Sequence, residues 1–171
     1  MDKEDENGDT YLLVSSKNKQ RNVVAYLLKR GAIVDKPDIK KRKPLWHAVV
    51  GNEVPVAREL LASVANVNVK PVGFNFPLEH CAKYGYQKLS ELLLGYKASI
   101  VQRCWHGNTS LQIAVQHNHP EIIQMLEVAA EKDRKRLLEN IITVGGEVQK
   151  DVLVRNYMQT YLIPAVDEEK L

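Results

Sequence analysis

Residues 23–35 have the sequence VVAYLLKRGAIVD, and the pattern returns as VARELLASVANVN at 56–68 and LSELLLGYKASIV at 89–101. The three stretches start 33 residues apart. In the first copy, apolar residues follow the spacing i, i+1, i+4 and i+5 that marks one side of a helix. Gly31 then suits the left-handed conformation in which many helices end. A period of this length, kept without a gap, predicts a repeat architecture built from short helices.

A further helix is predicted ahead of that stretch in each repeat, because a leucine is followed three residues later by a small residue in four copies. This combination marks the buried side of a short helix, and the small residue lets a neighbouring helix approach closely. Polar stretches containing glycine or proline follow at 35–42, 68–75 and 101–108 and predict hairpin-like turns. The leucines are Leu12, Leu45, Leu78 and Leu111, and the small residues are Ser15, Ala48, Cys81 and Ala114.

These segments resemble the ankyrin repeat, whose pattern runs Thr-Pro-Leu-His, two small residues, Val-Val, Leu-Leu and Gly-Ala-x-Val-Asn. The resemblance covers about residues 5–131 and implies an all-α repeat fold. That fold is an ankyrin solenoid of four helix-turn-helix repeats with hairpin-like turns and a helical C-terminal cap. Losing the Thr-Pro-Leu-His histidine in every copy, and the threonine in repeats two and three, lowers the expected stability of those two repeats without changing their fold. The repeats are expected at about 5–37, 38–70, 71–103 and 104–131 of a domain that spans 1–131.

Residues 132–171 are expected to form a helical cap and a short acidic tail, because the 33-residue register fails from Lys132 onward. Apolar residues keep helical spacing over 134–143, two glycines interrupt it, and a further helix is predicted over 147–162. The end of a solenoid exposes its core and needs a cap with a polar outer side. A docking element is the alternative role for this segment.

Composition predicts a soluble protein of the cytoplasm. The chain has 171 residues, 44% of them hydrophobic and 26% charged, with a net charge of +3. Two cysteines are too few for a disulfide framework and fit a reducing compartment. No apolar run is long enough for a bilayer, so no membrane association is expected. The run Lys40, Lys41, Arg42, Lys43 resembles a nuclear-import signal; it could instead grip an acidic partner or a phosphate backbone, or be a solvated turn.

No set of residues predicts catalysis. The sequence has no glycine-rich phosphate loop, no HExxH and no Gly-x-Ser-x-Gly motif, so neither an enzyme nor a cofactor is expected. Zinc is the one metal that side chains here could suggest, through Cys104, His106, His117 and His119. The repeat register places the first two on a turn and the others beyond the first helix, about 10 Å away. A metal site and direct nucleic-acid binding are therefore not expected.

The ankyrin resemblance implies a protein partner held on the concave face, which turn tips and the exposed sides of first helices form. We expect a non-enzymatic adaptor or inhibitor. The alternative is a host-directed viral or bacterial ankyrin protein, such as an inhibitor-of-NF-kappaB-like mimic that masks a transcription factor. Four apolar side chains at these exposed positions, Ile39, Val72, Tyr84 and Trp105, are of the kind that forms interface hot spots. The full expected set is Ile39, Lys40, Arg42, Val72, Asn75, Tyr84, Trp105, Asn108, Gln116 and His117.

Overall fold

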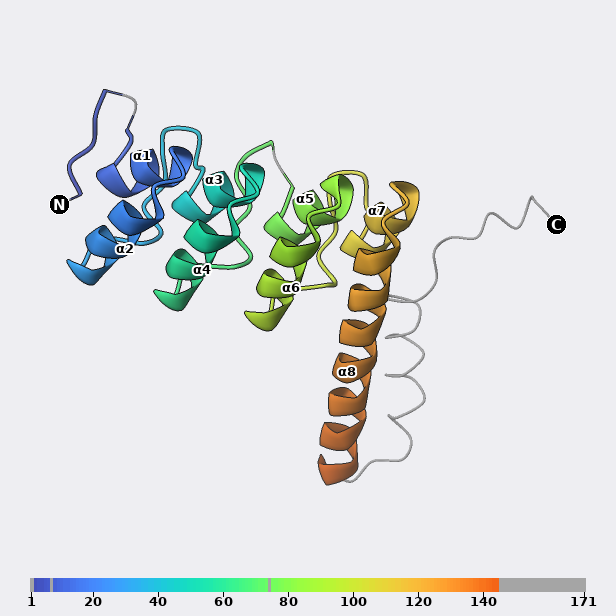
Figure 1. Cartoon of the computed structure of the whole chain (residues 1–171). Helices are drawn as coiled ribbons and strands as arrows, with labels where there is room; N and C mark the ends of the chain where they lie inside the picture. The colour runs from blue at the N-terminus through green and yellow to red at the C-terminus, as the bar shows by residue number, and fades with distance from the viewer. Residues whose placement is uncertain (1, 7, 74, 145–171) are drawn as a thin grey trace.

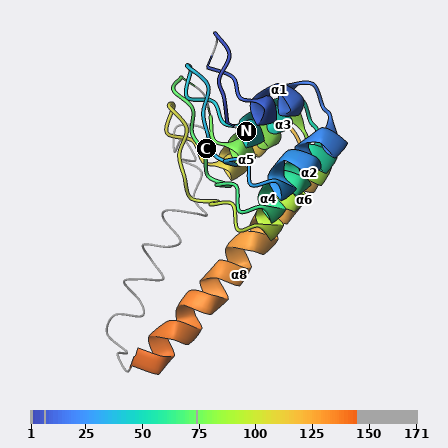
Figure 2. The same ribbon diagram turned by 90° about the vertical axis from the view of Figure 1, so that its left-hand side faces the viewer.

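The computed structural model describes residues 2–6, 8–73 and 75–144, and this part of the chain forms eight helices in four stacked pairs (Figure 1). The first helices of the pairs form one row and the second helices another. The hairpin-like turns gather beside the row of first helices (Figure 2). The predicted all-α ankyrin solenoid is confirmed. The pairs are α1 Tyr11–Lys17 with α2 Arg21–Lys29, α3 Pro44–Val50 with α4 Val54–Ala62, α5 Pro77–Tyr84 with α6 Gln87–Gly95, and α7 Ser110–Gln116 with α8 Pro120–Val144.

The core follows the sequence columns. The small residues three places after each leucine are all buried, and so are the leucines of the first three repeats. Each buried leucine contributes about 1.5–3 kcal/mol relative to an exposed one, so the columns supply most of the stacking energy. Leu111 is only half-buried, because α7 and α8 form the last repeat among the described residues.

Val23 shows the same end effect at the other side of the array. Val56, Leu89 and Ile122 share its column and are at most 1% exposed, whereas Val23 is 43% exposed. A residue in this column packs toward the preceding repeat, and α1 and α2 form the first repeat that the structure describes. Val23 therefore occupies a core column of the repeat pattern but is not buried in the structure.

Adjacent repeats are also tied by polar contacts that recur with the period. Asp35 accepts a hydrogen bond from the backbone N of Asn66, and Asn68, one repeat later, accepts one from the backbone N of Ser99. The guanidinium of Arg21 donates twice to Glu59, at 2.8 and 2.9 Å. Each tie reaches only the neighbouring layer, which is the nearest-neighbour organisation of a solenoid.

The helix starts explain how the array tolerates the lost histidines. Thr109 Oγ1 accepts from Gln112 N while Gln112 Oε1 accepts from Thr109 N, which is a capping box. In repeat three, Glu79 Oε2 accepts from Phe76 N at 2.9 Å. Gln112 and Glu79 occupy the position of the missing histidine, so the replacing side chains themselves join turn to helix.

Left-handed residues end the helices at two repeated positions. Lys19, Asn52, Gly85 and Asn118 have positive φ after the first helices, and Gly31, Val64 and Lys97 have positive φ after the second. Each set is spaced by 33 residues. Val64 is the anomaly, because its φ of +68° is a conformation that β-branched residues rarely adopt.

Replacing Val64 with glycine is expected to stabilise the fold by about 0.5–1 kcal/mol. The left-handed conformation costs an ordinary residue about 1–2 kcal/mol, and glycine gives back only part of this gain as backbone entropy. Little packing is lost, since Val64 is 85% exposed. A thermal melt should show a midpoint higher by a few degrees. Gly31→Val is the matched reverse change and should lower the midpoint; an unchanged midpoint in both variants would contradict the strain.

Helix α8 does not end where the repeat ends. α8 runs unbroken from Pro120 to Val144 and so passes through the expected boundary between repeats and cap at residues 131 and 132, which stays a prediction. Ala130 occupies the column of Gly31, Val64 and Lys97, yet it is helical, and no glycine or proline follows before residue 145. Arg134 donates to Glu131 one turn earlier, which supports the continuation. The helix expected at 147–162 and the acidic tail lie outside the described residues, and no described helix could span a membrane.

Candidate protein-binding surface

Three apolar side chains occupy one column at the tips of successive turns. Ile39, Val72 and Trp105 are 33 residues apart and are 69%, 72% and 67% exposed. Single exposed apolar residues are ordinary on protein surfaces, but three in register form a continuous line. Adjacent helix layers lie about 8–10 Å apart, so the line is about 20 Å long. We call these three residues the tip stripe.

A buried carboxylate shapes the turn of repeat two. Asp38 Oδ1 accepts from the backbone N of Lys40 and of Arg42, both at 2.9 Å, and Oδ2 accepts from Arg42 Nε at 2.7 Å. Burial alone would raise the pKa of Asp38, but the hydrogen bonds from Arg42 and Lys40 and the charge of Arg42 hold it below its ordinary value. Asp38 therefore stays ionised and fixes the turn that presents Ile39.

The basic run 40–43 separates into two kinds of residue. Arg42 is bound to Asp38, and Lys43 Nζ lies 3.2 Å from Asp35. The guanidinium of Arg42 holds the turn through Asp38, and its contact with a partner stays a prediction. Lys40 and Lys41 are the exposed charges beside it, at the tip.

Beside the turns of repeats three and four, the side chain of Lys70 contacts two aromatic rings. Lys70 Nζ lies 4.6 Å from the ring centroid of Phe76 and 5.3 Å from that of Trp105, one repeat further on. Cation–π attraction of this kind steadies the lysine without neutralising it. Lys70 and Phe76 were not among the expected binding residues; Phe76 replaces the threonine of the ankyrin pattern, and that departure was the available signal.

Three rings of the first helices, Trp46, His80 and Tyr84, form a cluster with Tyr86, the N-cap residue of α6, and we call these four rings the aromatic cluster. The His80 ring centroid lies 5.2 Å from that of Trp46 and 4.6 Å from that of Tyr84. Tyr84 and Tyr86 stack at 5.9 Å. Trp46 is buried and Tyr84 is half-exposed, so the cluster joins the core to the surface that the turns border.

Two histidines of this face, His47 and His80, have lowered pKa values. Burial lowers the pKa of His80 to about 4, and the charge of Lys83 adds to the effect. Burial likewise lowers the pKa of His47 to about 4, against the opposing pull of Asp38, whose Oδ2 lies 3.4 Å away. Both rings act as packing groups, in line with their shared column on the first helices.

Acid is expected to destabilise the fold through these rings. Between pH 6.5, the ordinary histidine pKa, and about 4, the unfolded chain binds protons at His80 that the folded chain does not. Stability is complete above that window and falls as the pH drops through it. Glu79, whose pKa is raised by burial, opposes this trend, because its protonation relieves a buried charge.

The measurement is urea unfolding above pH 6.5 and close to pH 4, for the wild type and for His80→Gln. The variant should lose less stability between the two conditions than the wild type does. His106→Gln, at an exposed tip position, serves as the control and should keep the wild-type dependence. An identical pH dependence in His80→Gln would contradict the assignment.

The remaining expected residues fall on the same face. Gln116 and His117 are exposed at the end of α7, Asn75 and Asn108 are half-buried, and Asn108 Nδ2 donates to Gln116 Oε1 at 3.5 Å. His119 packs elsewhere, with Nε2 3.2 Å from the carbonyl oxygen of Lys83. Within the described ranges, no three histidine, cysteine or acidic side chains gather as a metal site, and Cys104 is buried.

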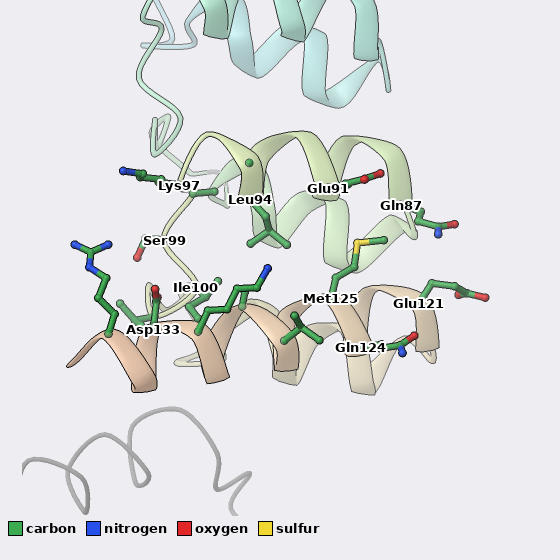
Figure 3. Close-up of a pocket in the computed structure, with 17 residues that line it drawn as sticks. Gln87, Glu91, Leu94, Lys97, Ser99, Ile100, Glu121, Gln124, Met125 and Asp133 are labelled. Carbon is green, nitrogen blue, oxygen red and sulfur yellow. The ribbon is translucent and has the colours of Figure 1, made fainter. Parts of the chain in front are cut away.

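A second concavity lies on the opposite side, between α6 and α8, with a volume of about 860 Å³ (Figure 3). Leu94 and Met125 reach toward one another from the two helices and form its apolar floor. Lys97 and Asp133 lie at one end and Glu121 at the other. The part of α8 within repeat four builds most of one wall of this groove, and its continuation adds Lys132, Asp133 and Arg136.

Comparison with known families agrees with this architecture. A profile described as ankyrin repeats (3 copies) matches residues 1–71, and one described as ankyrin repeats (many copies) matches residues 78–127. The chain belongs to the ankyrin-repeat family. Membership of this family makes the chain a protein-interaction module.

Relatives of known name share only the repeat array. The chain is 33% identical over 108 residues to the B-cell lymphoma 3 protein homolog of Mus musculus, covering 63% of this chain and 24% of that protein. It is 35% identical over 107 residues to the ankyrin repeat and KH domain-containing protein mask of Drosophila melanogaster, covering 61% and 3%. It is 35% identical over 111 residues to a putative palmitoyltransferase ZDHHC13 of Danio rerio, covering 62% and 17%. The chain spans a quarter or less of each relative.

Proposed function

We propose that the chain is a non-enzymatic adaptor or inhibitor that holds a protein partner on its concave face. The tip stripe carries this proposal. Ile39, Val72 and Trp105 contribute nothing to the described core, yet they repeat in register and remain exposed. Exposed apolar side chains in an ordered line are typical of contact surfaces.

The shape of this surface favours a macromolecule over a small ligand. A small-molecule site encloses most of its ligand, whereas the turns and first helices offer an open face several layers long. A stable protein interface buries about 800 Å² on each partner, and a face that spans three or four repeats can supply such an area. The tip stripe and Tyr84 would form the central contacts.

The test begins with affinity capture by the full chain, followed by mass spectrometry to identify the bound protein. Binding of that protein is then measured for Trp105→Ala and Tyr84→Ala. Loss of a hot-spot side chain typically costs about 2 kcal/mol or more, which corresponds to about 30-fold weaker binding. Tyr26→Ala is the matched control, since Tyr26 is 56% exposed and Tyr84 51%, but Tyr26 lies on α2 in the other row. Unchanged binding by both Trp105→Ala and Tyr84→Ala would remove the concave face as the site.

The identity of the captured protein also separates an adaptor from an inhibitor. An inhibitor that masks a transcription factor would retain that factor in the cytoplasm, and imaging of the factor with and without the chain would show it. We place the chain in the cytoplasm, with import through Lys40 and Lys41 as the alternative. If the tagged wild-type chain is found in the nucleus and the tagged Lys40→Ala, Lys41→Ala variant is not, the result favours import through these lysines.

A further inference from the structure

The tips of repeats two to four carry an excess of positive charge. Residues 68–76 and 101–109 contain lysine, arginine and histidine but no aspartate or glutamate, and in the equivalent segment 35–43 Asp35 and Asp38 are each bound to a basic side chain. The turn before repeat one is the opposite, because residues 2–6 have the sequence DKEDE. The tip stripe therefore runs through a basic surface that has an acidic margin at one end.

The lysines of this surface are available to a partner. Lys40 and Lys41 are exposed, and among the described residues no acidic side chain lies within ion-pair distance of them, since Asp35 and Asp38 are bound to Lys43 and Arg42. Lys70 is exposed and lies over the rings of Phe76 and Trp105. Glu79, whose pKa is raised by burial and partly lowered again by the charge of Lys70, is a buried residue. Three lysines thus flank three apolar anchors.

We propose that the tip stripe binds an extended acidic segment of the partner protein, with an apolar side chain at every third residue. This proposal rests on the proposed function and specifies the chemistry of the partner. In a polyproline II conformation the chain has three residues per turn and advances about 9 Å per turn, which matches the layer spacing of about 8–10 Å. Every third side chain then meets Ile39, Val72 or Trp105, and the acidic residues between them face the lysines.

A protein segment fits better than a nucleic acid. A protein that makes about 6–10 phosphate contacts binds nucleic acid with a steep salt dependence, whereas only three lysines, Lys40, Lys41 and Lys70, flank the tip stripe. The stripe also presents two aliphatic side chains, Ile39 and Val72, where nucleobases would need flat aromatic rings to stack on. The acidic turn at residues 2–6 would repel a longer phosphate backbone.

The test measures binding of labelled synthetic peptides to the full chain by fluorescence anisotropy. The probe is LDPLDPLDPLD, whose prolines disfavour a helix and whose leucines recur every third residue. LNPLNPLNPLN is the neutral isostere, LKPLKPLKPLK the basic one, and LDPDLDPDLDP shifts the leucines to every fourth residue. Single-stranded DNA of similar length is the competing class of ligand.

The acidic probe is expected to bind at least about 10-fold more tightly than the neutral one, and its affinity should fall as salt rises from about 50 to 200 mM. Lys40→Glu, Lys41→Glu should weaken it at least about 10-fold. Lys29→Glu, Lys88→Glu is the matched control, because both lysines are exposed on second helices and the change in net charge is equal. This control should bind the acidic probe as the wild type does.

Several results would overturn the proposal. Equal binding of the acidic and neutral peptides would exclude an acidic partner while leaving a protein-binding face intact. Tighter binding of the basic peptide or of single-stranded DNA than of the acidic peptide would also exclude an acidic partner. Equal binding of the peptide with leucines at every fourth residue would exclude the three-residue spacing. The proposed function itself fails separately, when Trp105→Ala and Tyr84→Ala leave the captured protein bound.

Discussion

Replacing Leu89 with alanine is expected to lower the free energy of unfolding by about 2–5 kcal/mol. Leu89 lies on α6, is completely buried, and packs toward the preceding repeat. The truncation removes buried apolar surface and leaves a cavity that the surrounding side chains fill only partly. Because each repeat of a solenoid contacts only its neighbours, a cavity in repeat three weakens the connection between the two halves of the array.

The same column supplies the control. Val23→Ala and Val56→Ala are identical changes, but Val23 is the exposed member and Val56 is buried. Val56→Ala should cost about 1–3 kcal/mol and Val23→Ala less than about 1 kcal/mol. Urea unfolding followed by circular dichroism measures all three variants. If Val23→Ala were as damaging as Val56→Ala, the first repeat would need a further layer against it, and the explanation of its exposure would be wrong.

Replacing Gly85 with alanine is expected to cost about 2 kcal/mol or more, for two reasons that act together. Gly85 has φ of +74°, a conformation that costs a residue with a side chain about 1–2 kcal/mol. A Cβ atom there would also lie 2.7 Å from His119 Cε1 and 2.9 Å from His119 Nδ1, so the imidazole must move. Moving it loosens the contact of His119 with the carbonyl oxygen of Lys83, which ties repeat four to repeat three.

A double-mutant cycle separates the two causes. In a His119→Ala background the steric conflict is absent, so Gly85→Ala should cost only its backbone term. Asn118→Ala is the control for that term, since Asn118 holds the equivalent position with φ of +56°. Thermal melts of the four members of the cycle give the coupling. If the cost of Gly85→Ala were the same in both backgrounds, the imidazole would not be the obstacle.

The repeat period predicted the features that depend only on position along the chain. Columns of leucine and small residues predicted the helices and the core. The same 33-residue register placed four apolar residues outside the core: Ile39, Val72, Tyr84 and Trp105. Their exposure in the structure agrees with that placement, while their role in binding stays a prediction.

The features that the period did not predict depend on where long side chains reach. Arg42 and Asp38 are neighbours in sequence, but only the folded turn shows that the guanidinium is committed to the carboxylate. Lys70 meets Trp105 across 35 positions, a distance slightly longer than one repeat. Helical spacing over 134–143 predicted the far part of α8, but its continuity with the second helix of repeat four was not predicted, although no glycine or proline occurs between Pro120 and residue 145.

The ties between adjacent layers determine how the chain responds to mechanical load. Arg21 with Glu59 and Asp35 with Asn66 both cross the boundary between repeats one and two, and Asn68 with Ser99 crosses the next boundary along the axis. A pulling force on the two ends passes through every boundary in turn, so the weakest one yields first and the others stay closed. Each layer that opens releases 33 residues, or about 110 Å of extended chain. Under load, the array is therefore expected to lengthen in steps of one repeat.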